Sequence, residues 1–240
     1  MCATTEQELR QYPLFRNCSD SFFTDMANDA HVLKTSKGQV LFLHDDPAER
    51  FYYISSGWVK LFRETLDGAQ AVVDVFTRGN IIGEGALFED NIYPYTAEVV
   101  EAGSLISLSL SILNRELQSN NQFTNDMLGF MARNKRQKDK EIEHISLQNA
   151  PQRIGCFLLG FLNKTEGGAT IHLPYDKTLV ASRLGMQPET FSRALGKLKV
   201  STGINVKGAT IEVSDIETLV SFSCVACSAE FPCKELCSKC

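Results

Sequence analysis

The 240-residue sequence lacks any run of apolar residues close to the roughly 18 that a membrane-spanning helix needs. Its first residues, MCATTEQELRQY, lack the basic and apolar regions of a signal peptide. We therefore expect a cytoplasmic protein with no membrane partner. No segment resembles a catalytic triad, a phosphate-binding loop or a paired acid and base, so the sequence does not indicate an enzyme.

The chain as a whole also lacks a net positive charge, since its formal net charge is -5. Residues 1–149 carry 14 Lys and Arg against 21 Asp and Glu, residues 150–223 carry eight against six, and residues 224–240 carry two of each. The only positive segment is therefore 150–223. This modest excess permits nucleic-acid binding there but does not require it.

Cysteine is absent from residues 19–155, and five of the eight cysteines fall in the last 17 residues. In a reducing compartment such a cluster indicates a metal, an iron–sulfur cluster or redox chemistry rather than disulfides. Closely spaced thiolates can converge on one soft centre, which suits a [4Fe–4S] cluster or a tetrahedral zinc. The candidate ligands are Cys224, Cys227, Cys233, Cys237 and Cys240. The other three, Cys2, Cys18 and Cys156, are interpreted as terminal or buried thiols.

Residues from about 32 to 108 have the pattern of short strands separated by glycines, which is typical of a small β-sandwich or barrel. The expected strands are Gln39–Leu43, Phe51–Ile54, Trp58–Arg63, Ala69–Phe76, Thr96–Val100 and Ser104–Leu108. Turns are expected at Gly38, Gly57, Asp67-Gly68, Gly79 and Gly103. A short helix capped by Ser19 precedes them, with Phe22, Phe23 and Met26 turned inward.

Helical spacing replaces this alternation from Ser111 to about Gln148 and predicts one long helix. Its apolar positions could pair with a second copy of the chain, which gives four candidate dimerisation residues: Met127, Met131, Ile142 and Ile145. The basic run at 133–140 is interpreted as a solvated face of this helix. Asn149-Ala150-Pro151 marks a helix boundary and hinge, followed by a helix over Gln152–Phe161.

A helix-turn-helix is predicted between about Asp176 and Lys199. Gly185 supplies the turn, Pro188 suits the first turn of the second helix, and the small Ala181 allows the helices to approach. The expected interior is Val180, Ala181, Leu184, Met186, Phe191, Leu195 and Leu198. A wing follows, formed by Ile204–Val206, a turn at Lys207-Gly208, and Thr210–Val213.

Three polar residues of the second helix fall on one face because they stand at positions i, i+3 and i+4. Arg193 can donate to guanine O6 and N7, Glu189 can accept from a cytosine amino group, and Ser192 can approach a thymine methyl. Ser182, Lys197 and Lys199 are candidates for phosphate contacts. The alternative is a surface helix on which Glu189 and Arg193 form an ion pair.

Residues from about Leu14 to Phe222 resemble the Crp/Fnr family of transcription regulators. The resemblance rests on Gly57, Gly68, Gly79 and Gly83-Glu84, on the long helix, and on the winged helix-turn-helix. The runs Ile145–Ala150 and Gln187–Arg193 are similar to the Dnr and Fnr branches. The resemblance implies an α+β fold in which a β-roll similar to cyclic-nucleotide-binding jelly rolls (1–110) is followed by a dimerisation helix and hinge (111–149), a DNA-binding domain (150–223) and a cysteine-rich tail (224–240).

The resemblance further implies that Glu189, Ser192 and Arg193 bind a TTGAT half-site, so that a homodimer would bind TTGAT-N4-ATCAA. RNA polymerase is an expected partner. In relatives that bind cyclic AMP, an Arg-Ser pair holds the phosphate. This chain has Pro94-Tyr95-Thr96 there, which argues against cyclic AMP even though Gly83-Glu84 is present.

The tail offers a different sensor. Its C-x2-C-x5-C spacing is the one that oxygen-sensing Fnr proteins carry near the N-terminus, and some family members carry a C-terminal cluster instead. Cys237 or Cys240 is the preferred fourth ligand, with Cys18 or a carboxylate as alternatives. The cluster would respond to oxygen, nitric oxide or redox poise.

Three alternatives remain open at this point. The tail could bind zinc or act as a thiol switch, or it could be a frayed end with no regulatory consequence. The Dnr resemblance allows a haem in the β-roll, with His31, His44, His144 and His172 as candidate ligands. A function of a different class, iron–sulfur electron transfer, is disfavoured because a cluster on such a tail would be poorly insulated.

Overall fold

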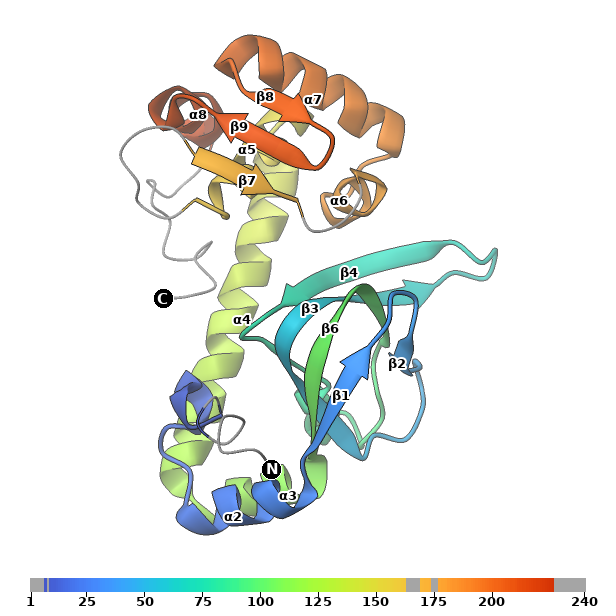
Figure 1. The fold of residues 1–240 in the computed structure, drawn as a ribbon, viewed down its shortest axis with the longest axis vertical. Helices are drawn as coiled ribbons and strands as arrows, with labels where there is room; N and C mark the ends of the chain where they lie inside the picture. The colour runs from blue at the N-terminus through green and yellow to red at the C-terminus, as the bar shows by residue number, and fades with distance from the viewer. Residues whose placement is uncertain (1–6, 8, 163–168, 174–176, 227–240) are drawn as a thin grey trace. The chain divides into compact units, whose positions relative to one another are not determined.

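The computed structural model describes residues 7, 9–162, 169–173 and 177–226 (Figure 1). The chain divides into two compact units, Met1–Ala132 and Arg133–Cys240. Helix α4 (Asn121–Leu147) contributes residues to both units. No helix in the described part of the chain has the length and apolar character needed to cross a membrane.

The first unit is built on an antiparallel sheet in the order β1-β6-β3-β4, with β2 paired to β6 and β5 paired to β3. The strands are β1 (His31–Thr35), β2 (Val40–Phe42), β3 (Arg50–Glu64), β4 (Gln70–Thr77), β5 (Ile81–Ile82) and β6 (Thr96–Ser109). Turns at Gly38, Gly68 and Gly79 are confirmed, and each of these glycines has a positive φ.

The expected turns at Gly57 and Gly103 are wrong, because both residues lie inside continuous strands. Strands β3 and β6 approach so closely here that a Cβ on Gly57 would lie 2.7 Å from Glu101 O, and one on Gly103 would lie 2.1 Å from Ser56 O. The register between the strands also shifts around Ser56 and Trp58. These glycines therefore permit a close backbone contact at a bulge, and they do not end the strands.

Helices cover one end of this sheet. They are η1 (Pro13–Phe15), α2 (Asp20–Asp29), η2 (Glu84–Phe88), α3 (Leu110–Ser119) and the first part of α4. Ser19 Oγ accepts a hydrogen bond from the Phe22 backbone N–H at 3.1 Å, which confirms the expected cap. Phe22, Phe23 and Met26 are buried in the core, also as expected.

The single helix predicted from Ser111 to Gln148 is in fact two helices, α3 and α4. Asn120 separates them with an extended backbone (φ -123°, ψ 96°). Its side-chain oxygen accepts from the Phe123 N–H at 3.1 Å, and its amide donates to Glu116 at 2.7 Å. Asn120 thus caps the start of α4, and a cap of this kind interrupts a helix even where the apolar spacing continues.

The second unit contains the rest of α4 and a small antiparallel sheet in the order β7-β9-β8. Its further elements are α5 (Ala150–Leu159), β7 (Ala169–His172), α6 (Lys177–Arg183), α7 (Pro188–Thr202), β8 (Asn205–Lys207), β9 (Thr210–Val213), α8 (Ile216–Ser223) and η3 (Cys224–Ala226). Helix α5 begins two residues earlier than expected, because Asn149 and Gln152 form a capping box. Pro151 lies in its first turn, as predicted.

Candidate nucleic-acid interface

Helices α6 and α7 form the predicted helix-turn-helix (Figure 1). Gly185 adopts the left-handed conformation (φ 62°), and the Met186 N–H donates to Ala181 O at 3.0 Å, which closes the turn. Pro188 occupies the first turn of α7. Of the expected interior residues, Val180, Ala181, Phe191, Leu195 and Leu198 are buried, whereas Leu184 and Met186 are half-buried.

Two arginines tie this motif to neighbouring helices. Arg153 of α5 donates to Leu184 O, at the end of α6, over 3.0 Å. Burial lowers the pKa of Arg153, and its Nε has no hydrogen-bond partner among the described residues. Arg183 of α6 forms an ion pair with Glu141 of α4. Sequence reasoning missed both contacts, because they join residues 31 and 42 positions apart and no local pattern indicates them.

The exposed face of α7 carries the three residues predicted to contact bases. Glu189, Ser192 and Arg193 are all exposed, while Phe191 and Leu195 are buried on the other side of the helix. Both partners of the alternative surface ion pair lie in the described part of the chain, and no such pair forms between Glu189 and Arg193 there. The three side chains are therefore available to an external ligand on one face of a helix.

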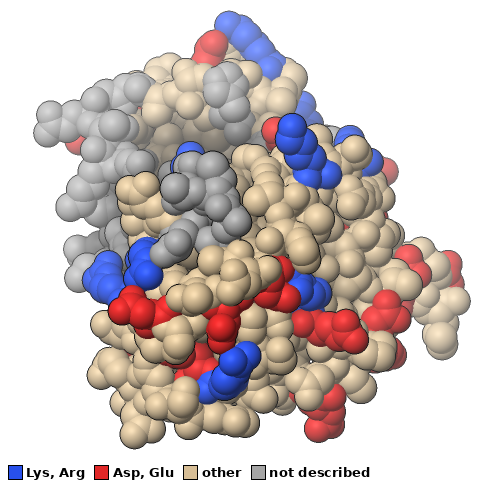
Figure 2. Space-filling view, turned by 60° about the horizontal axis from the view of Figure 1, so that its bottom comes forward, with Lys and Arg blue, Asp and Glu red and all other residues tan. Residues whose placement is uncertain are grey.

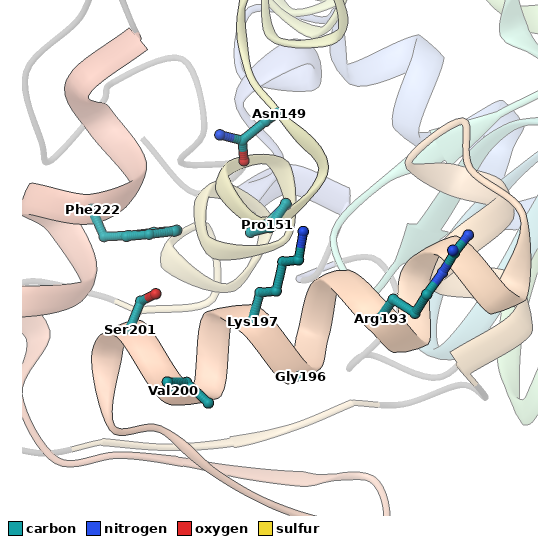
Figure 3. A pocket seen from close by; sticks show the side chains of 8 residues that line it. All are labelled: Asn149, Pro151, Arg193, Gly196, Lys197, Val200, Ser201 and Phe222. Carbon is teal, nitrogen blue, oxygen red and sulfur yellow. The ribbon is translucent and has the colours of Figure 1, made fainter.

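The candidate phosphate-binding residues flank this face. Lys197 and Lys199 are exposed on α7, and Ser182 is half-buried on α6. An open groove of about 750 Å³ lies beside α7, and Figure 3 shows Arg193 and Lys197 extending from α7 on the side of α5. The groove is lined by Asn149, Pro151, Arg193, Gly196, Lys197, Val200, Ser201 and Phe222. A row of exposed cations beside an open groove suits an anionic polymer.

Lys207 is the last residue of β8 in the wing and directly precedes the turn at Gly208 (φ 61°), so the turn begins one residue later than expected. Lys207 Nζ lies 3.2 Å from Glu212 Oε1, and Asn205 donates to the same carboxylate at 2.9 Å. The bond from Lys207 is the main cause of a lowered pKa at Glu212. In the wing, the ion pair with Glu212 therefore compensates part of the charge of Lys207.

The β-roll contrasts with this face in its charge. Residues 1–110 carry 16 Asp and Glu against eight Lys and Arg. Figure 2 shows Asp and Glu side chains gathered on one face of the molecule with a few Lys and Arg among them. Such a surface does not attract phosphates. Arg63 Nε donates to Pro94 O at 2.9 Å, and its guanidinium lies 5.1 Å from the Tyr95 ring centre, so this arginine contacts the Pro94-Tyr95 segment.

Gly83 and Glu84 lie at the start of η2 in the roll. Gly83 has a φ of 87° and precedes η2, and a Cβ there would lie 3.3 Å from the Tyr93 ring. Burial raises the pKa of Glu84 to about 7. The pair therefore combines a backbone conformation that favours glycine with a carboxyl group that is hard to ionise.

Among the candidate cluster ligands, only Cys224 lies within the described residues. It caps the C-terminal end of α8 and is half-buried. Cys227, Cys233, Cys237 and Cys240 lie outside the described residues, as does Cys2. Within the part of the chain that is described, no group of three or more His, Cys, Asp or Glu side chains could hold a metal ion.

Among the cysteines and histidines whose side chains the structure describes, Cys156 and His144 lie close together. Cys156 is buried, and its Sγ lies 3.8 Å from His144 Nδ1, which agrees with a packed thiol. Cys18 is half-buried, and burial followed by the charge of Glu116 raises the pKa of its thiol. His31 and His44 are exposed, and the side chain of His172 is not described.

The four candidate dimerisation residues differ in exposure. Met131, Ile142 and Ile145 are 39%, 62% and 54% exposed on α4. Met127 is 1% exposed and belongs to the core of the first unit, so it offers no surface to a second copy. The periodicity that selected Met127 reflects packing within one chain at that position.

Comparisons with known proteins agree with this geometry. A family model for the cyclic nucleotide-binding domain matches residues 32–120, and one for the Crp-like helix-turn-helix domain matches residues 152–222. A putative cyclic nucleotide binding protein from Ruegeria pomeroyi is 30% identical, with 92% of this chain and 98% of that chain covered and a TM-score of 0.68.

Two further relatives are named as regulators. DNR from Pseudomonas aeruginosa is 31% identical over 92% of this chain and 99% of its own, with a TM-score of 0.53. The fumarate and nitrate reduction regulatory protein of Vibrio cholerae is 24% identical, covering 79% of this chain and 77% of its own. A sensor-type β-roll joined to a winged helix-turn-helix defines a DNA-binding transcription regulator. The chain belongs to the Crp/Fnr family of these regulators.

Proposed function

We propose that this regulator binds an Fnr-like palindrome, TTGAT-N4-ATCAA, as a homodimer and that a [4Fe–4S] cluster on its C-terminal cysteines controls the binding. The observation that carries the DNA part is the exposure of Glu189, Ser192 and Arg193 on one face of α7, opposite a buried apolar side. A helix with this division of faces can enter the major groove without uncovering its own core.

Each of the three side chains has a role that follows from its chemistry. The guanidinium of Arg193 donates two parallel hydrogen bonds to guanine, the carboxylate of Glu189 accepts from a cytosine amino group, and Ser192 contacts a thymine methyl. Lys197, Lys199 and Ser182 bind phosphates and fix the register of the helix on the duplex. Arg153 supports the site indirectly, because it holds the carbonyl that ends α6.

The homodimer is supported by the apolar row on α4. Met131, Ile142 and Ile145 leave apolar side chains exposed on a charged helix, and apolar side chains at helical spacing pack well against a second copy. A two-fold dimer presents two copies of α7 to two half-sites, which matches a palindrome. RNA polymerase is the further partner that a regulator of this kind would contact.

The direct test is fluorescence anisotropy with a labelled TTGAT-N4-ATCAA duplex, in the absence of oxygen and at a stated salt concentration. We expect binding at least 100-fold tighter than to a scrambled duplex of the same length, a ratio of about 10³ or more being usual for specific regulators. Equal affinity for the two duplexes would overturn the proposed binding site.

The cluster proposal rests on the spacing of the tail cysteines and on the position of Cys224. This residue follows Ser223, which is fully buried, so the first ligand begins from a fixed point at the end of α8. Cys227 and Cys233 would be further ligands, and Cys237 or Cys240 the fourth. When bound, such a cluster supplies reactivity toward oxygen and nitric oxide.

Anaerobic purification followed by a visible spectrum and by iron and sulfide analysis tests the cluster. We expect a brown protein with about four irons and four sulfides per chain, as a [4Fe–4S] centre contains. The Cys227→Ser variant should lose the colour, whereas Cys156→Ser should keep it, since Cys156 is a packed thiol. A colourless protein with one zinc per chain would overturn the cluster in favour of a zinc site or thiol switch.

A second candidate function is a haem-based sensor. It is supported by the 31% identity to DNR, because the resemblance to that branch is what suggests haem as the cofactor. Here haem would bind in the β-roll and respond to nitric oxide. Addition of haem to the purified chain distinguishes the haem sensor from the iron–sulfur sensor. A stoichiometric Soret band is expected for the haem sensor and none for the iron–sulfur sensor. We do not propose cyclic AMP, because Pro94-Tyr95-Thr96 supplies no cation to a buried phosphate.

A further inference from the structure

The groove beside α7 combines apolar and cationic walls. Pro151 of α5, Val200 of α7 and Phe222 of α8 supply apolar surface, and Arg193 and Lys197 supply positive charge (Figure 3). Val200 is 89% exposed, although it lies on a helix whose other side is well packed. A surface of this composition fits a peptide that carries apolar side chains next to carboxylates.

The floor of the groove is open rather than filled. Gly196 lies between Arg193 and Val200 along α7, and a Cβ added there would meet nothing within 4 Å. In the described part of the chain, neither Arg193 nor Lys197 forms an ion pair. The groove therefore has free space, exposed apolar surface and two cations available for a ligand.

The C-terminal tail starts beside this groove. Phe222 forms one wall, and residues 227–240 begin five positions later. These 14 residues could extend over about 46 Å, whereas the stretch of α7 from Arg193 to Ser201 is only about 12 Å long. The tail is therefore long enough to run along the whole groove.

The sequence of the tail also matches the walls. It places an acidic residue next to an apolar one twice, at Glu230-Phe231 and at Glu235-Leu236. Two apolar side chains would meet the apolar surface of the groove, and two carboxylates would meet its two cations. The tail also carries Lys234 and Lys239 and is neutral overall, so it is the placement of each acidic residue beside an apolar one that favours this segment of the chain as the occupant.

We propose that residues 227–240 bind in the groove of their own chain, with Phe231 against Val200 and Phe222 and with Glu230 beside Arg193 or Lys197. The tail then covers two residues that contact DNA in the proposed function, on which this consequence rests, and competes with DNA for them. Cys227 and Cys233 flank Phe231 in the sequence, so the segment proposed for the groove is also the one that carries the candidate cluster ligands.

Photochemical crosslinking tests the location of the tail without reference to DNA. The full chain is prepared metal-free, with reduced cysteines, and with a benzophenone amino acid in place of Phe231. We expect crosslinks to peptides that contain residues 149–151 or 193–201. Crosslinks confined to other parts of the chain, or no more crosslinking than from the same amino acid at exposed Leu66, would overturn the proposal.

A mixture of ¹⁵N-labelled and unlabelled chains distinguishes the tail of the same chain from that of a partner. Crosslinks within one isotope population are expected. Mixed products as frequent as unmixed ones would assign the groove to a second copy and would contradict the proposal.

A double-mutant cycle tests the consequence for DNA binding. In metal-free protein, Val200→Ser and Phe231→Ser should each tighten DNA binding by about fivefold, and the double variant should bind no tighter than either single one, because both remove the same contact. Val225→Ser is the matched control, since Val225 is 79% exposed and does not line the groove.

The two tests separate the proposals. Crosslinks to the groove without any specific DNA binding would leave the tail site standing and remove the proposed function. Specific DNA binding with no effect of either serine variant, or with additive effects, would remove the competition and leave the proposed function standing.

Discussion

Gly155 of α5 and Ser223 of α8 are in such close contact that a Cβ added to Gly155 would lie 2.0 Å from Ser223 Oγ. Ser223 has no exposed surface, and its hydroxyl has no hydrogen-bond partner among the described residues. Nearby, Gln148 Nε2 donates to Ser223 O at 3.5 Å. The residue that precedes the cysteine-rich tail is thus packed directly against the hinge between α4 and α5.

The variant Gly155→Ala should be strongly destabilised, because helix α8 must shift to admit the methyl group. A loss of about 2–3 kcal/mol in the free energy of unfolding is expected from overpacking of this kind, measured by chemical denaturation. Gly196→Ala is the matched control, because its Cβ meets nothing, and it should stabilise α7 by up to about 1 kcal/mol. Ser223→Gly should restore part of the loss in Gly155→Ala, and equal stability of the two alanine variants would contradict the contact.

The buried hydroxyl of Ser223 leads to a prediction of opposite sign. Ser223→Ala removes a buried hydroxyl that has no hydrogen-bond partner among the described residues. The variant should therefore raise the free energy of unfolding by about 1 kcal/mol. Ser221→Ala, at an exposed hydroxyl of the same helix, should change it by less than about 0.5 kcal/mol. A loss of stability in Ser223→Ala would indicate a partner for this hydroxyl.

The sequence predicted the α+β fold, the cap of α2 and the helix-turn-helix, because each depends on local features such as an N-cap serine, a turn glycine and helical spacing. It did not predict that Gly57 and Gly103 lie within strands. A glycine at a turn and a glycine where two strands cross look the same in a single sequence, and only their pairing across the sheet separates them. The division between α3 and α4 was missed although Asn120, a good N-cap residue, was the available signal.

The exposed residues of the candidate site could be predicted from the sequence, but the contacts that hold the site to neighbouring helices could not. The exposure of Glu189, Ser192 and Arg193 follows from helical periodicity once Phe191 and Leu195 are assigned to the core. The contacts of Arg153 with Leu184 O and of Arg183 with Glu141 could not be found in this way, because they join separate helices. Strand β7, which pairs with the wing, was also not foreseen.

The raised pKa of Glu84 makes stability depend on pH. Since burial raises this pKa from its usual 4.5 to about 7, the folded state binds more protons than the unfolded state between these values. Stability should therefore fall as pH rises from about 4.5 to 7, and the loss should persist above 7, by at most about 3 kcal/mol.

Glu84→Gln tests this dependence, because glutamine keeps the shape of the side chain and does not ionise. The variant should be more stable than the parent chain at pH 8 and nearly equal to it at pH 4.5, by chemical denaturation at both values. Glu64→Gln, at an exposed position at the end of β3, should leave the difference between the two pH values unchanged. A parallel pH profile for Glu84→Gln and the parent would refute the assignment.

Arg193 and Lys197 lie one helical turn apart on α7 and line the same groove, yet their variants should behave differently. Arg193→Ala should weaken binding to TTGAT-N4-ATCAA by about 1–3 kcal/mol and should hardly affect a scrambled duplex, because a bidentate contact to guanine carries sequence information. Lys197→Ala should weaken binding to both duplexes alike and reduce the slope of log K against log salt concentration by about 1, because a phosphate contact releases counterions and does not distinguish bases. Anisotropy titrations of both variants with both duplexes at four salt concentrations separate these outcomes. Equal weakening by Arg193→Ala on the two duplexes would place Arg193 on the phosphates and leave the sequence preference to Glu189 and Ser192.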